Sequence, residues 1–216
     1  MNKKINQFGR SMVEMLGVLA IIGVLSVGAI AGYSKAMNKY KMNKQTEQID
    51  TILSAISRYK LELRKFNKST DDKNYNLIPF LKKLREIPET MYVKNNEEKI
   101  QDAFKTQYTI YHHSTGKMYV GLRGFVSNSS DGVETCKNLY TIAKNWHNEV
   151  SFIEIVSYKS STEHREGFLY GDYECSTDSS KKCLSTATVK DIDDACRVFK
   201  KDNNNYSILF VFWDAE

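Results

Sequence analysis

Proline is almost absent from this chain of 216 residues, which contains only Pro79 and Pro88. Because proline removes a backbone donor and clashes with the preceding helical turn, its absence from residues 1–78 allows one uninterrupted helix there. Charge is absent from residues 11–34 with one exception, the carboxylate of Glu14. Residues 11–34 therefore lack proline and almost lack charge.

Recognisable catalytic and metal-binding motifs are also missing. The chain has no G-x-S-x-G, no H-E-x-x-H and no glycine-rich phosphate loop. Its cysteines form no C-x-x-C pair, the spacing typical of structural zinc sites. Asp191, Asp193 and Asp194 lack the glycine turn and distal glutamate of a calcium loop. His112 and His113 would point to opposite faces of a strand, so we expect surface residues rather than a metal pair. We therefore expect no enzyme, metal site or cofactor.

The composition is that of a folded chain with a mild charge. Hydrophobic residues make up 41% and aromatic residues 12%, which argues against disorder. The formal net charge is +5, too weak to favour a nucleic-acid partner.

Hydrophobic residues follow two different patterns in the first part of the chain. Residues 11–34 are apolar without periodicity and exceed the ~20 residues that a membrane helix needs. Beyond them, apolar residues recur at helical spacing, with charged residues between them: Ile49, Ile52, Leu53, Ile56, Tyr59 and Leu63. We predict one helix over residues 11–66. Its first part is apolar on all sides and its second part is amphipathic, with a globular domain packed against the apolar stripe of that second part.

The remaining residues predict short strands and helices. Turn formers fill residues 67–74, and Thr188 is a candidate helix cap. Helices are expected at residues 77–88, 136–146 and 191–199, and strands at 106–113, 117–126, 151–158, 167–173 and 205–213. The last strand is almost entirely apolar and is expected at the centre of the sheet. This order predicts an α+β fold with an antiparallel sheet.

Two ordinary interpretations of the N-terminus are open. A signal peptide is one, because Ala29-Ile30-Ala31 before Gly32 resembles a cleavage site. A plain membrane anchor is the other. Its orientation is not set by the loop charges, since basic residues lie on both sides of the apolar run: Lys3, Lys4 and Arg10 before it, and Lys35, Lys39, Lys41 and Lys44 after it.

A third interpretation follows from the residues before the apolar run. A short basic leader ends in Gly9, and Glu14 is the fifth residue after it. This arrangement resembles a type IV prepilin. The resemblance implies that a prepilin peptidase cuts after Gly9 on the cytoplasmic side and methylates the new amine of Arg10. The chain departs from the family at Arg10, where prepilins usually have a bulky apolar residue.

The resemblance also gives Glu14 a role. A charge at the centre of a membrane helix costs roughly 2.5–3.5 kcal/mol on insertion scales. In a filament of staggered identical helices, Glu14 can pair with the amine of Arg10 in a neighbouring subunit and set the register. Within one helix, Glu14 can instead pair with its own Arg10 or favour the helix N-terminus.

Three glycines stand where many pilins have a helical proline: Gly23, Gly28 and Gly32. Glycine weakens a helix by ~1 kcal/mol relative to alanine, so these residues are candidate soft points. The Gly28-x-x-x-Gly32 pair alternatively allows close helix approach.

The four cysteines are Cys136, Cys175, Cys183 and Cys196. An even number outside the cytoplasm predicts two disulfides, and four cysteines allow three pairings. A cysteine shortly before a terminal apolar strand looks like the end of type IVb pilins. That resemblance implies the pairs Cys136–Cys196 and Cys175–Cys183.

Four segments are expected on this interpretation: a leader (1–9), a transmembrane and assembly part (10–34), an amphipathic helical half (35–66) and a globular α+β domain (67–216). The expected function is that of a structural type IV pilus subunit, held in the inner membrane as a single-pass protein and extracellular after assembly. Its expected partners are further copies of itself, prepilin peptidase, the assembly machinery of the inner membrane and, before assembly, lipid. A minor pilin and a type II secretion pseudopilin are alternatives within the family. A secreted or anchored binding protein with a signal peptide is the alternative from another class.

Overall fold

The computed structural model describes residues 12–64, 74–113, 119–126, 130–159, 162–200 and 205–213. The chain divides into two compact units, Met1–Tyr40 and Lys41–Glu216, which are described separately below. In the first unit, the described residues belong to helix α1, which spans Met12–Arg64 in total. The predicted helix over residues 11–66 is confirmed across this described range.

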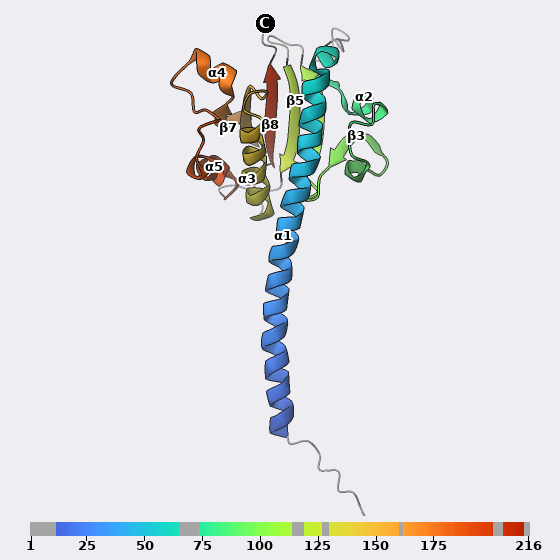
Figure 1. The fold of residues 1–216 in the computed structure, drawn as a ribbon, viewed down its shortest axis with the longest axis vertical. Helices are drawn as coiled ribbons and strands as arrows, with labels where there is room; N and C mark the ends of the chain where they lie inside the picture. The colour runs from blue at the N-terminus through green and yellow to red at the C-terminus, as the bar shows by residue number, and fades with distance from the viewer. Residues whose placement is uncertain are drawn as a thin grey trace, which may run out of the picture. The chain divides into compact units, whose positions relative to one another are not determined.

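The second unit is built on one antiparallel sheet (Figure 1). Its strands are β1 (Asn74–Asn76), β2 (Tyr92–Val93), β3 (Asn96–Gln101), β4 (Gln107–His113), β5 (Tyr119–Val126), β6 (Phe152–Lys159), β7 (Thr162–Tyr170) and β8 (Asn205–Trp213). The strand order is β2-β3-β4-β5-β8-β6-β7, and β1 pairs with β4. Strand β8 lies between β5 and β6, so its predicted central position is confirmed.

Short helices surround this sheet. They are α2 (Ile78–Lys83), α3 (Ser130–Asn145), α4 (Asp172–Thr177) and α5 (Val189–Cys196), with 3-10 helices η1 (Glu89–Met91) and η2 (Arg197–Lys200). Thr188 caps α5 as predicted, because its hydroxyl accepts from the backbone N–H of Asp191 and the Asp191 carboxylate accepts from the backbone N–H of Thr188. Helix α3 and the part of α1 from residue 41 onward lie on the same face of the sheet (Figure 1).

The main core lies between that part of α1, α3 and the sheet. The predicted stripe of α1 is buried at Ile49, Ile52, Leu53, Ile56 and Leu63, and Tyr59 is partly buried beside it. These side chains share one cluster with residues of α3 and the sheet: Leu139, Tyr140, Ile110, Leu122, Ile208 and Phe210. Burying a large aliphatic side chain contributes ~1.5–3 kcal/mol, so this half of the helix is an integral part of the domain. The fold is thus α+β and pilin-like.

Some element boundaries differ from the sequence-based prediction. The predicted helix over residues 77–88 ends at Lys83, and the predicted strand over 167–173 is replaced by the longer β7 and the start of α4. Gly171 separates β7 from α4, and a Cβ there would overlap the backbone carbonyl oxygens of Val150 and His147. Only glycine fits this close approach of the backbones, at the point where β7 ends and α4 begins.

Candidate assembly surface and buried polar groups

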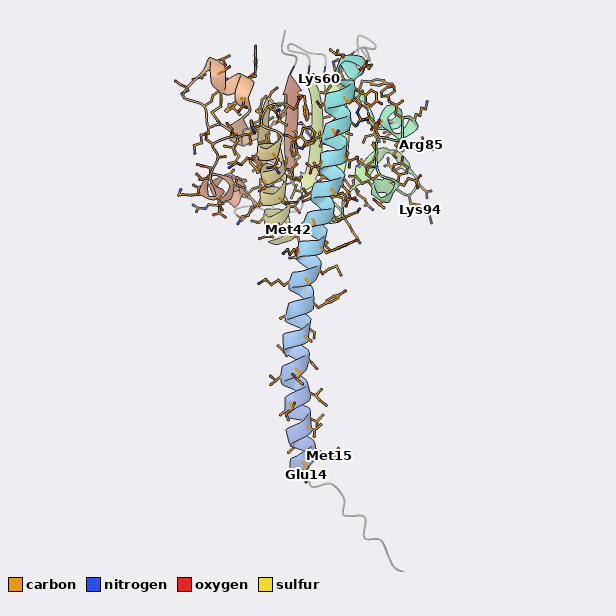
Figure 2. The ribbon with its side chains drawn as sticks, in the orientation of Figure 1. Glu14, Met15, Met42, Lys60, Arg85 and Lys94 are labelled. Atoms are coloured by element: carbon orange, nitrogen blue, oxygen red, sulfur yellow. A yellow bond between two sulfur atoms is a disulfide. The ribbon has the colours of Figure 1, made fainter. Side chains whose placement is uncertain are left out.

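The described residues of the first unit expose apolar side chains all round the helix. The following are each more than half exposed: Met15, Leu16, Val18, Leu19, Ile21, Ile22, Val24, Leu25, Val27 and Ile30. Figure 2 shows side chains projecting from both sides of this part of α1. By length and composition, the helix can cross a membrane. A continuous apolar surface of this kind marks a lipid or protein contact, so the segment is a candidate membrane anchor or protein-contact surface.

Glu14 lies in the first turn of described α1 and is labelled beside Met15 in Figure 2. An acidic residue there is favoured by the positive end of the helix dipole. Gly9 and Arg10 lie outside the described residues, so cleavage after Gly9, methylation of Arg10 and their link to Glu14 stay predictions. Gly23, Gly28 and Gly32 lie within α1 with open space beside them, and their role as soft points also stays a prediction.

Two disulfides staple the second unit. Cys136 of α3 is bonded to Cys196 at the end of α5, across a separation of 60 residues. Cys175 of α4 is bonded to Cys183, across a separation of 8 residues. These are the pairs that the type IVb resemblance implies. Cys136 and Cys196 are both fully buried, so this disulfide ties α5 to α3 within the core.

A buried polar cluster joins α1 to the domain just before the apolar stripe begins. It consists of Gln45, Asp102, Tyr108 and Asn138, and we call it the Asp102 cluster. The Asp102 carboxylate accepts from the Gln45 amide and from the Tyr108 hydroxyl, the latter at 2.6 Å. The Asn138 amide donates to the Gln45 side-chain oxygen at 2.8 Å. Three elements distant in sequence therefore meet through directional bonds, which fix how α1 is rotated on the domain.

The charge state of Asp102 is set by competing effects. Burial raises the pKa of Asp102, and hydrogen bonds from Tyr108, Gln45 and the backbone N–H groups of Thr106 and Phe104 oppose that rise. The two backbone bonds measure 2.9 and 2.8 Å. An unpaired buried polar group is costly, and this carboxylate is surrounded by donors. We therefore assign it a structural role.

A second buried carboxylate, Glu154, lies on the opposite face of the sheet. It alternates along β6 with the core residues Ile153 and Ile155. Its Oε1 accepts from the Arg165 guanidinium at 2.8 Å, and Arg165 also pairs with Glu163 at 2.7 Å. The Glu154 side chain is fully buried. Burial raises the pKa of Glu154 to about 7, against the attraction of Arg165.

This opposite face also carries a small apolar cluster of strand residues: Tyr111, Val156, Leu209 and Val211, with Phe152 partly buried against it. Sequence reasoning did not single out Glu154. The available signal was a lone carboxylate within the apolar stretch 152–156, the same kind of signal that drew attention to Glu14.

The expected surface position of His112 is wrong. His112 is only 1% exposed and lies on the helix-covered face of β4, in register with Val120 of β5. Its strand is interior to the sheet, because β3 and β5 flank it. The side chain of His113 lies outside the described residues. Within the part of the chain that the structure describes, no three His, Cys, Asp or Glu side chains cluster as metal ligands would.

Stability is expected to depend on pH through Glu154. Its pKa of about 7 exceeds the ordinary value of 4.5, so the folded state binds the proton more tightly than the unfolded state. Ionised Glu154 therefore lowers stability above pH ~7, and lowering the pH from about 8 to about 6 should stabilise the fold by ~1 kcal/mol. Thermal unfolding of the detergent-solubilised chain should show a melting temperature a few degrees higher at the lower pH.

Two variants control this measurement. Glu154→Gln should remove the gain between the two pH values, whereas Glu97→Gln, at an exposed position, should retain it. The same gain in Glu154→Gln as in the unmodified chain would contradict the assignment.

The second unit thus provides an α+β domain with two disulfides, and the first unit provides an apolar helix with one acidic residue at its start. Comparison of the chain with family models, with curated proteins and with solved structures gave no match.

Proposed function

We propose that this chain is a structural subunit of a type IV pilus, assembled through its N-terminal apolar helix after prepilin peptidase removes residues 1–9. The observation that carries the proposal is the contrast within α1. Residues 14–30 expose apolar side chains on every side, whereas between residues 49 and 63 an apolar stripe of α1 is buried in a domain crosslinked by disulfides. A subunit of this kind has one helix that is available for polymerisation and one domain that is already folded.

The apolar segment then has two successive environments. Lipid surrounds it while the subunit is in the inner membrane, and helices of neighbouring subunits surround it in the filament. Both environments are apolar, so the transfer costs little hydrophobic free energy. Glu14 is the exception, because its carboxylate needs a charged or hydrogen-bonded partner in either environment. The amine that cleavage creates on Arg10 of a neighbour is that partner in the filament.

The mass of the N-terminal peptide tests this proposal. In cells that contain a prepilin peptidase, filaments sheared from the surface should give a mature peptide starting at Arg10, with or without one methyl group. A Gly9→Val variant should keep Met1 and yield no filaments, because the peptidase needs the glycine. A minor pilin would give the same peptide from a small share of the filament mass.

Other N-termini would contradict the proposal. A peptide starting at Gly32 would assign a signal peptide and a secreted binding protein. An intact Met1 in the unmodified chain would assign a plain anchor.

A further inference from the structure

The charges that follow the apolar run of α1 are of one sign. Lys35, Lys39, Lys41 and Lys44 precede the first acidic residue, Glu47, and no aspartate or glutamate lies between Glu14 and Glu47. Lys44 pairs with Glu47 at 2.8 Å, and Lys41 lies over the Phe104 ring at 5.8 Å. Lys35 and Lys39 are exposed and form no ion pair with any described residue.

These two lysines lie between two exposed tyrosines of the first unit. Tyr33 is 66% exposed and Tyr40 is 62% exposed. At ~100° per residue, Lys35 and Lys39 share one side of the helix, and Tyr33 and Tyr40 share a second side, roughly 130° around the helix axis. The four side chains therefore occupy two sides of α1 over a height of ~10 Å. We call Tyr33, Lys35, Lys39 and Tyr40 the Tyr-Lys belt.

The distance from Glu14 to the belt matches a bilayer. Residues 15–32 carry no charge, and eighteen helical residues rise ~27 Å, close to the ~30 Å thickness of a hydrocarbon core. With Glu14 at the membrane face nearest the leader, Tyr33 reaches the far interface. Tyrosine is enriched at such interfaces because its ring is apolar and its hydroxyl is polar.

We propose that the Tyr-Lys belt binds the phosphate groups of anionic phospholipids in the leaflet farthest from the leader. Lys35 and Lys39 supply the charge that an anionic headgroup attracts, and Tyr33 and Tyr40 hold the helix at the depth where those headgroups lie. The proposal rests on the proposed function only in taking residues 14–32 as membrane-spanning before assembly.

Such binding would regulate assembly. Positive charge on the far side of a membrane helix opposes the usual orientation bias, and anionic headgroups neutralise that charge locally. Extraction of the subunit into a filament must break these phosphate contacts. The anionic lipid content of the membrane would then set how readily a subunit leaves it.

Lipid retention tests the inference. The mature full chain is reconstituted in nanodiscs of equal parts phosphatidylcholine and phosphatidylglycerol and transferred to mild detergent. Retained lipids are then counted by native mass spectrometry. The unmodified chain should retain phosphatidylglycerol over phosphatidylcholine by roughly 25-fold, because each of the two lysines near an anionic surface raises affinity about fivefold. The preference should shrink in high salt, which screens exposed charges.

A matched pair of variants assigns the effect to the belt. Lys35→Gln/Lys39→Gln should bring the ratio of the two lipids close to one. Lys83→Gln/Lys94→Gln removes the same charge from exposed positions of the domain and should leave the ratio unchanged. Inorganic phosphate at millimolar concentration should not displace the lipid, since displacement would make this a site for free anions and overturn the lipid assignment.

The remaining outcomes are equally decisive. Equal retention of both lipids by the unmodified chain, or an equal loss of preference in both variants, overturns the inference. Alkaline extraction of the chain from its native membranes is a separate readout. A chain that is washed off was never membrane-spanning, which contradicts the proposed function itself. A chain that stays embedded without lipid preference contradicts the belt alone.

Discussion

Glu14→Leu is expected to leave the subunit folded and membrane-embedded but to reduce the yield of sheared filaments by about a hundredfold or more. Removing one partner of a buried ion pair costs ~3–5 kcal/mol, because the remaining charge is left uncompensated. In the proposed filament, that remaining charge is the amine of Arg10 in the neighbouring subunit. The measurement is the amount of subunit in the sheared fraction relative to the membrane fraction.

The substitution is expected to favour insertion into the membrane, so the experiment tests assembly rather than insertion. Leucine is more favourable than glutamate within a bilayer by a few kcal/mol on insertion scales, so the variant inserts at least as well as the unmodified chain. A loss of filaments cannot then be attributed to failed insertion. Intact disulfides on a non-reducing gel would show that the domain has folded.

A second carboxylate on the same helix serves as the control. Glu47 pairs with Lys44 at an exposed position of α1, where an ion pair contributes ~0–1 kcal/mol. Glu47→Gln should therefore assemble normally. A normal filament yield from Glu14→Leu would refute the role given to Glu14.

Replacing both Cys136 and Cys196 with alanine is expected to destabilise the domain by ~4 kcal/mol. In the chain-entropy model, the stabilisation by a disulfide grows with the length of the loop that it closes, and this pair is separated by 60 residues. For a domain of this size, such a loss lowers the melting temperature by about 10 °C. Near-UV circular dichroism during heating measures the shift.

The shorter disulfide is the matched comparison. Cys175 and Cys183 are separated by 8 residues and are only partly buried. Their replacement with alanine should cost ~2.5 kcal/mol in the same model. An equal or larger loss of stability on replacing Cys175 and Cys183 would contradict the expected order of the two effects.

The elements that sequence reasoning placed correctly are those with strong local signals. Helix α1 was predictable from its periodicity and its lack of proline, and β8 from its nearly unbroken apolar run. The start of α5 was predictable because Thr188 and Asp191 form a capping box three residues apart. In each case, the residues that determine the structure are neighbours in sequence.

The missed features depend on contacts between distant segments. Strand β3 has the polar sequence NEEKIQ, with Ile100 as its only fully buried residue, and its extended form depends on pairing with β2 and β4. Propensity alone does not identify such a strand, because strand formation depends strongly on tertiary context.

The buried polar groups were missed for a similar reason. Gln45 and Asp102 are separated by 57 positions. Glu154 meets Arg165 through a strand pairing that contains a register shift. No spacing rule indicates either contact, since both follow from the register of strands and the rotation of a helix.

The position of β8 has a consequence for how this protein is made. Strands β1 to β5 form one paired group and β6 with β7 another, and β8 alone joins them. During synthesis, the two groups emerge earlier, each with an unpaired strand edge at β5 or β6. The sheet can close only when residues 205–213 arrive. A chain truncated before that point therefore exposes two unpaired strand edges, at which strands of other chains can pair.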